Sequence, residues 1–257
     1  MFLKNFIHIS NKHNFFFQCA SLKNIIKNIF YILSCRLADL NICVGKNISQ
    51  KLIQNLKVSP KKVTTIENGV PVKKQVKKKK AKKPTVLFTG RLVKRKNLSA
   101  LLRSLKIINQ DFLCLVVGSG PEKQTLQKYI LKHNLQNKIK LVGFKSDVNP
   151  YLKAADIFVL PSLNEGLSKS LLEAMSYGLA CIVSNIDSNL ELIKHQKNGL
   201  VFDLKKGEKD LSKNLQILLK NATLRKKLGQ KARKTILKNY TEKQMLEKYL
   251  RVFQKLA

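Results

Sequence analysis

Residues 156–178, DIFVLPSLNEGLSKSLLEAMSYG, constrain the fold more than any other stretch of this 257-residue chain. Residues 157–160 form a short apolar run that Pro161 ends, which is typical of an inner strand of a parallel sheet. A polar loop, 162–168, follows, and an amphipathic helix is expected to begin near Ser168. The order strand, loop, helix predicts an α/β fold. Open parallel sheets bind ligands beyond the carboxyl ends of their strands, so this loop is the expected active site.

Two carboxylates, Glu165 in the loop and Glu173 in the helix, lie eight positions apart. Helical side chains lean toward the N-terminus, so both acids could address one polyhydroxyl ligand. Gly166 allows a ligand to approach the backbone, and the free N–H groups of the helix start suit a phosphate or a sugar hydroxyl. The alternative is that Glu173 is an ordinary solvated helix residue and Glu165 an ordinary loop acid.

Strands and helices alternate along most of the chain, as in a Rossmann-like parallel sheet. Gly90 ends one predicted strand, and Arg91 and Lys96 lie in the loop that follows it. The strands are expected near 5–9, 39–44, 63–66, 85–89, 113–117, 139–142, 157–160, 181–183 and 200–202. The helices are expected at 22–37, 47–56, from about 97, 122 and 168, as a short helix that ends with 151–155, at 189–193, and as three closing helices, the last at 242–256.

The central stretch resembles the E-x7-E signature of retaining GT-B glycosyltransferases, a family with the pattern EG-small-small-LEAMA-G-P-V. Here it comprises Glu165-Gly166 and, further on, Leu172-Glu173-Ala174-Met175-Ser176-Tyr177-Gly178. Other family elements are matched by Ala38-Asp39, Asn68-Gly69-Val70, Gly90-Arg91-Leu92 with Lys96, Gly118-Ser119-Gly120-Pro121, and Glu191 with Asn198-Gly199. Gly45 departs from this pattern, because the family usually has a serine there.

The resemblance implies roles for individual residues. Arg91 and Lys96, after Gly90, would hold the diphosphate of a nucleotide-diphospho-sugar, where two cations stabilise the charge of the leaving group. Glu173 would bind the ribose hydroxyls. The sugar would contact Glu165 and the backbone of Gly166, Leu167 and Ser168. A family histidine also contacts the transferred sugar, and the candidates are His13 and, less well placed, His8. No cofactor or metal ion is expected, because the two cations take the place of a metal.

The resemblance also implies two Rossmann-like domains, with the acceptor bound by the first and the donor by the second. Residues 1–72 are expected to be a remnant of the acceptor domain, and 73–84 a lysine-rich linker. Residues 85–240 would form the donor domain, and 241–257 a helix that crosses back to the N-terminal part. The family's N-terminal glycine-rich loop has no counterpart. The alternative is therefore a donor-binding subunit, or an inactive remnant, that needs a partner chain for its acceptor domain.

The chain carries 50 Lys and Arg against 15 Asp and Glu, a net charge of +35. Such a charge permits nucleic acid, anionic lipid or an anionic substrate as a partner. The lysines are spread along the chain without an aromatic platform, so nucleic acid is not expected. Helix 22–37 has Ile29, Phe30 and Leu33 on one side. That side is expected to face the core, and the alternative is an anionic membrane surface.

The five cysteines are odd in number, form no C-x-x-C pair and lie mostly in apolar runs, which indicates reduced core residues of a cytosolic protein. The sequence has no stretch of eighteen apolar residues, so no membrane span is predicted. Lys4 and Lys12 interrupt the start of the chain, which therefore lacks the apolar core of a signal peptide. We therefore expect a cytoplasmic glycosyltransferase, at the inner face of the membrane if its acceptor is lipid-linked. It would transfer sugar, with retention, to a glycan or lipid-linked acceptor in cell-surface polysaccharide or glycolipid synthesis.

Overall fold

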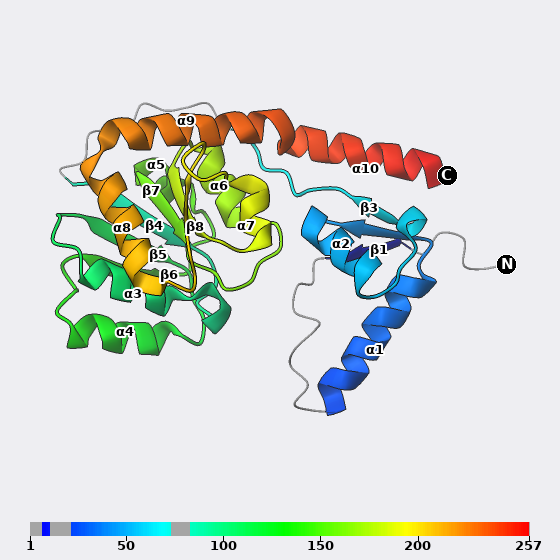
Figure 1. Cartoon of the computed structure of the whole chain (residues 1–257), viewed down its shortest axis with the longest axis horizontal. Coiled ribbons are helices and arrows are strands. Elements are labelled where there is room, and N and C mark those ends of the chain that lie inside the picture. The colour runs from blue at the N-terminus through cyan, green and yellow to red at the C-terminus, as the bar shows by residue number, and fades with distance from the viewer. Residues whose placement is uncertain (1–6, 11–21, 73–82, 257) are drawn as a thin grey trace.

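The computed structural model describes residues 7–10, 22–72 and 83–256, which form a larger and a smaller α/β unit (Figure 1). The larger unit contains a six-stranded sheet of order β6-β5-β4-β7-β8-β9, and every neighbouring pair is parallel. Its strands are β4 (Thr85–Thr89), β5 (Leu113–Val117), β6 (Ile139–Gly143), β7 (Ile157–Leu160), β8 (Ala180–Ser184) and β9 (Leu200–Phe202). The predicted parallel sheet is confirmed, and all six expected strands are present.

The helices that connect these strands, and two helices that follow β9, lie against the sheet (Figure 1). They are α3 (Leu98–Lys106), α4 (Lys123–Lys132), α5 (Asn149–Ala154), α6 (Lys169–Ser176), α7 (Asp187–Leu192), α8 (Gly207–Lys220) and α9 (Ala222–Asn239). Chain order runs outward in one direction from β4 through β5 to β6, and in the other direction from β7 through β8 to β9. The order therefore reverses between β4 and β7, which is where sheets of this kind bind ligands.

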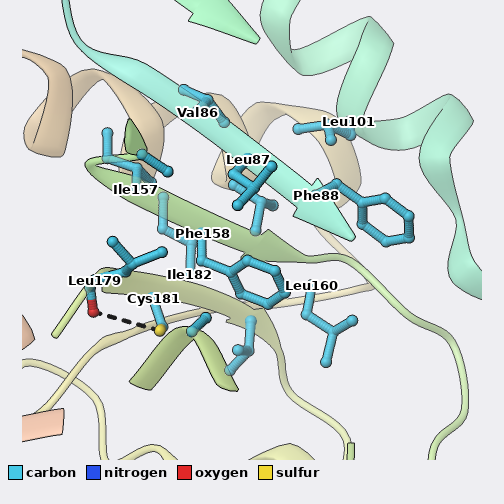
Figure 2. Close-up of a cluster of buried hydrophobic side chains, with 14 of the residues drawn as sticks. Val86, Leu87, Phe88, Leu101, Ile157, Phe158, Leu160, Leu179, Cys181 and Ile182 are labelled. Carbon is cyan, nitrogen blue, oxygen red and sulfur yellow. Dashed lines mark hydrogen bonds between the residues drawn. The ribbon is translucent and has the colours of Figure 1, made fainter. Parts of the chain in front are cut away.

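The core of the larger unit lies around three of its four inner strands, β4, β7 and β8, whose residues are all buried. Phe88, Phe158 and Ile182 project into this core (Figure 2) and are fully buried. Each such side chain contributes roughly 1.5–3 kcal/mol of burial free energy. This rigid apolar centre fixes the positions of the strand ends where the loops begin.

Four of the five cysteines fall within the described residues, and all four, Cys35, Cys43, Cys114 and Cys181, are buried and free of disulfides. Burial raises the pKa of the Cys114 thiol to about 12. These cysteines are therefore the reduced core residues that the sequence predicts.

The smaller unit is a parallel sheet of order β1-β2-β3, formed by Ile7–Ser10, Leu40–Cys43 and Val63–Thr65. Helices α1 (Leu22–Leu37) and α2 (Lys46–Gln54) and the short 3-10 helix Pro60–Lys62 belong to it. Its own small core includes Tyr31, Cys35, Ile48 and Leu52. The strands and helices expected in this region are present.

The expected orientation of α1 is wrong for the side chains that the structure describes. Ile29, Phe30 and Leu33 are 51%, 69% and 47% exposed, whereas Tyr31 and Cys35 are buried. The helix has apolar residues on two sides, so periodicity alone did not decide which side would pack. The contact with the small core selects Tyr31 and Cys35, which lie four residues apart on one face.

The two units meet where the segment after β3 passes the start of the last helix, α10 (Glu242–Leu256), which lies beside the smaller unit (Figure 1). Val70 N–H donates to the Tyr240 carbonyl at 3.0 Å, and Glu242 N–H donates to the Val70 carbonyl at 3.1 Å. A Cβ atom at Gly69 would lie only 2.5 Å from the Thr241 carbonyl oxygen, so this close crossing requires glycine.

Candidate functional site

A cavity of about 520 Å³ opens at the carboxyl ends of the strands, beside the reversal point of the large sheet. Its wall is formed by residues 89–91 at the end of β4, 117–120 at the end of β5, Phe144, Lys145 and Val148 after β6, and Ser170 and Glu173 of α6. Most of these residues come from strand ends or the loops after them. The fold therefore places the cavity where a parallel sheet of this topology binds its ligand.

Glycine allows the ends of β4 and β5 to lie close together in this wall. Gly118 has a φ of +146°, and a Cβ atom there would lie 1.9 Å from the carbonyl oxygen of Gly90. Any side chain at position 118 would therefore push the two strand ends apart. The glycines of the predicted 118–121 turn therefore allow close approach of backbone to backbone at this wall of the cavity.

Arg91 and Glu173 bring opposite charges to the cavity wall. Arg91 is exposed, and Glu173, in the second turn of α6, is half-buried. Burial raises the pKa of the Glu173 carboxyl above its ordinary value of 4.5, while Lys169 acts in the opposite direction. The buried Thr89 hydroxyl, also in the wall, has no hydrogen-bond partner. A ligand with both anionic and hydroxyl groups matches this set of side chains.

The second predicted acid, Glu165, lies in an ion-paired cluster rather than in the cavity wall. The Glu165 side chain is 7% exposed. Its Oε1 atom lies 2.5 Å from Lys96 Nζ and accepts a hydrogen bond from the Ser162 hydroxyl at 2.7 Å. Its Oε2 atom lies 3.2 Å from Arg95 Nη1. Two cations and a hydroxyl thus stabilise this buried carboxylate.

Lys96 connects this cluster to the cavity. A Cβ atom at Gly90, a residue of the cavity wall, would lie 3.8 Å from Lys96 Cε. The ammonium group of Lys96 therefore lies near the wall while its side chain is only 9% exposed. The short 3-10 helix Lys94–Lys96, followed by Asn97 in the left-handed region at φ 53°, turns Lys96 inward and leaves Arg95 partly exposed.

The loop between β7 and α6 also reaches the smaller unit. Asn68 Nδ2 donates to the Leu167 carbonyl at 3.4 Å, and a Cβ atom at Gly45 would lie 3.7 Å from Leu167 Cβ. Nearby, Glu191 of α7 accepts hydrogen bonds from the backbone N–H groups of Lys46 and Asn47. The expected sugar-binding loop therefore lies at the junction of the two units.

The structure brings the predicted site residues together in two groups. Gly90, Arg91 and Glu173 line the cavity, and Glu165 and Lys96 form the adjacent ion pair. The three loop residues Gly166, Leu167 and Ser168 are buried beside them and do not line the cavity. His13 lies outside the described residues, and His8 falls in β1, of which only the backbone is described.

Sequence reasoning missed Thr89, Ser170 and Arg95. Thr89 is the last residue of β4 and Ser170 the second residue of α6. Their positions at a strand end and a helix start could have indicated that they border the cavity. Arg95 is one of three consecutive cations, and no signal in the sequence distinguishes it from its neighbours. Among the described residues no group of three or more His, Cys, Asp or Glu could hold a metal ion.

Residues 70–235, more than half of the chain, match the family described as Glycosyl transferases group 1. The chain belongs to this family. The names of two curated bacterial relatives describe enzymes that act on lipid-linked sugars. One is an Escherichia coli galactosyltransferase that uses UDP-Gal and GlcNAc-diphosphoundecaprenol, 32% identical over 212 residues, which cover 75% of this chain and 55% of the relative.

The other relative is a Campylobacter jejuni N-acetylgalactosaminyltransferase that acts on diacetylbacillosaminyl-diphospho-undecaprenol. It is 28% identical over 252 residues, covering 92% of this chain and 66% of the relative. The chain thus spans between about half and two thirds of the length of these two relatives.

Solved structures of GT-B glycosyltransferases share the fold. A mutant of S. aureus TarM in complex with UDP and two saccharide ligands superposes with a TM-score of 0.84 at 22% identity, covering 96% of this chain and 50% of TarM. Anabaena HepE in complex with UDP-glucose superposes with a TM-score of 0.86 at 17% identity, covering 98% of this chain and 72% of HepE. At these identities the likeness establishes the fold alone, which is the GT-B architecture that the sequence predicts.

Proposed function

We propose that the chain is a glycosyltransferase that binds a nucleotide-diphospho-sugar in the 520 Å³ cavity and transfers the sugar to a lipid-linked or glycan acceptor. The observation that supports this most is the cavity itself, at the reversal point of the sheet, with Arg91 and Glu173 in its wall and Lys96 beside Gly90. Its cation, carboxylate and unpartnered hydroxyl match a ligand that has phosphates at one end and sugar hydroxyls at the other.

The two cations support catalysis by stabilising the leaving group. When the bond between sugar and diphosphate breaks, negative charge accumulates on the diphosphate oxygens. Arg91 and Lys96 would then interact more strongly with the transition state than with the bound donor, and this difference lowers the barrier. No metal ion or other cofactor is required for this step.

The carboxylates would bind hydroxyl groups. Glu173, in the cavity wall, would accept hydrogen bonds from the ribose. Glu165, with the backbone of Gly166, Leu167 and Ser168, would hold the transferred sugar next to the smaller unit. His13 is the proposed histidine on that sugar, with His8 as the alternative. Retention of the anomeric configuration is part of the proposal, and it rests on the resemblance of residues 165–178 to the E-x7-E signature of retaining enzymes.

The acceptor side of the proposal is supported by the relatives, which act on sugars linked to diphospho-undecaprenol. We infer the same acceptor class for this chain, in cell-surface glycan synthesis at the cytoplasmic face of a membrane. No described helix is long and apolar enough to cross a membrane. The exposed side chains Ile29, Phe30 and Leu33 of α1 in a chain of net charge +35 fit peripheral contact with anionic lipid.

Calorimetric titration with a panel of nucleoside diphosphates and their sugars tests the donor site. One nucleotide sugar is expected to bind. Either Glu173→Ala or Lys96→Ala should lower its affinity at least tenfold, which corresponds to about 1.4 kcal/mol of binding free energy. Arg103→Ala, an exposed arginine of α3, is the matched control and should not change the affinity. Equal affinities in all variants would contradict the donor site.

Incubation of the chain with that donor and a diphospho-undecaprenol sugar tests the transfer. Product formation supports a complete enzyme. Binding of donor without transfer would instead favour a donor-binding subunit that takes its acceptor domain from a partner chain.

A further inference from the structure

Arg95 belongs to the loop after β4 and contacts the loop between β7 and α6, and these two loops contain most of the proposed donor-binding residues. Its Nη1 atom lies 3.2 Å from Glu165 Oε2 and donates to the backbone carbonyl of Asn164 at 3.3 Å. The other carboxylate oxygen, Oε1, lies 2.5 Å from Lys96 Nζ. Each oxygen of the buried Glu165 carboxylate thus has its own cation.

Lys96 is needed in two places if the proposed function is correct. In the structure its ammonium group pairs with Glu165, while its side chain passes beside Gly90 at the cavity wall. A bound diphosphate would attract that ammonium group into the cavity. Glu165 Oε1 would then keep only its hydrogen bond from the Ser162 hydroxyl. Such a change is energetically unfavourable, because it removes a cation from a buried carboxylate.

We propose that Arg95 is a positioning residue, the counter-ion that keeps Glu165 paired and in place while Lys96 turns to the diphosphate. The proposal rests on the proposed function of the cavity. The backbone supports it, because the Arg95 carbonyl accepts a hydrogen bond from Leu163 N–H at 2.8 Å. This bond ties the Arg95 segment to the Glu165 loop, so the pair can persist when the Lys96 side chain moves.

The burial of its partner distinguishes Arg95 from an ordinary surface arginine. Arg95 is 43% exposed, but Glu165 is 7% exposed. By contrast, Arg103 is 45% exposed and pairs at 3.6 Å with Glu208, which is itself 44% exposed. Both side chains of the Arg103 pair are exposed to water, which weakens their attraction, whereas the Arg95 guanidinium pairs with a carboxylate that is almost completely shielded from water.

A double-mutant cycle on nucleotide affinity tests this role. UDP is titrated into the unmodified chain, Arg95→Gln, Glu165→Gln and the double variant. Arg95→Gln is expected to lower the affinity for UDP at least fivefold when Glu165 is present, because Lys96 then remains paired with Glu165. In the Glu165→Gln background the Arg95→Gln change should lower the affinity for UDP less than twofold. Arg95→Lys should restore part of the affinity, and Arg103→Gln should change nothing.

Two outcomes would overturn the proposal. An equal loss in both backgrounds would mean that Arg95 merely attracts phosphate through its charge. No loss in either background would mean that Glu165 does not need Arg95.

Urea unfolding without ligand separates this proposal from the donor site. Lys96→Met imitates the withdrawal of Lys96, so Arg95→Gln should lower the unfolding midpoint more in that background than in the unmodified chain. An equal shift in both backgrounds would overturn the role of Arg95. If the unmodified chain binds no nucleoside diphosphate, the proposed donor site fails, and the unfolding comparison still decides whether Arg95 compensates Glu165.

Discussion

The carboxylate of Glu191 in α7 caps the first turn of α2 across the junction of the two units, and its bond to Asn47 is the shorter contact. Glu191 Oε1 accepts the Asn47 backbone N–H at 2.7 Å, and Oε2 accepts that of Lys46 at 3.2 Å. Gly45, the N-cap residue of α2, has no side chain to do this. The helix therefore takes its cap, and a favourable negative charge, from the other unit.

Glu191→Ala should remove both hydrogen bonds and destabilise the chain by about 1 kcal/mol, the usual cost of a lost helix cap. Glu191→Gln keeps an acceptor oxygen and should lower the free energy of unfolding by a smaller amount. Chemical denaturation measures the free energy of unfolding, and hydrogen exchange at the amides of Lys46 and Asn47 reports the local effect. Unchanged exchange at these two amides in Glu191→Ala would show that the cap is not formed in solution.

Lys96→Met should destabilise the chain by about 3 kcal/mol, the low end of the range for a broken buried ion pair, because Arg95 still pairs with the Glu165 carboxylate. Adding Glu165→Gln to this variant should recover most of the loss, since no buried charge then remains unpaired. Equilibrium denaturation of the two variants measures both values. A double variant less stable than Lys96→Met alone would contradict this account of the ion pair.

Gly118→Ala should cost more than about 3 kcal/mol, since it combines backbone strain with a collision between strand ends. The added Cβ atom would lie 1.9 Å from the Gly90 carbonyl oxygen. Gly143→Ala is a matched control at the end of β6: its φ is +83°, with nothing within 4 Å of the new Cβ atom. That variant should lose only about 1 kcal/mol. Thermal and urea unfolding distinguish the two, and similar losses would mean that the strand ends separate easily.

Donor binding should weaken as the pH falls, because burial raises the pKa of the Glu173 carboxyl and its protonated form accepts ribose hydroxyls poorly. Titrations between about pH 7.5 and pH 5 should show this decline in the unmodified chain and a flatter profile in Glu173→Gln. An identical profile in both would assign the pH dependence to another group.

The same raised pKa affects stability in a defined direction. The stabilising contribution of the protonated Glu173 carboxyl is complete below its unfolded pKa of about 4.5 and is lost as the pH rises through the folded value. Glu173→Gln should therefore be more stable than the unmodified chain at neutral pH, and this advantage should vanish below about pH 4.5. Unfolding midpoints at pH 4 and pH 7 measure the difference.

Periodicity and turn residues were sufficient to predict nearly every element of the fold. The run from Ile157 to Leu160 is a fully buried strand, and α6 begins at Lys169, next to the predicted Ser168. These elements follow from local preferences and apolar patterns that each segment carries by itself. Helix α1 is the exception, because two of its sides are apolar and only the packing partner selects between them.

The sequence by itself determined the α/β fold, the membership of a glycosyltransferase family and the residue types of the site, because glycines, strand ends and helix starts follow local rules. Only the tertiary structure decided how those residues pair. Arg95 and Glu165 are seventy positions apart, and Asn47 and Glu191 are further apart still. Such contacts depend on how strands β4 and β7 align and how the two units meet, and no local pattern encodes the distance between their side chains.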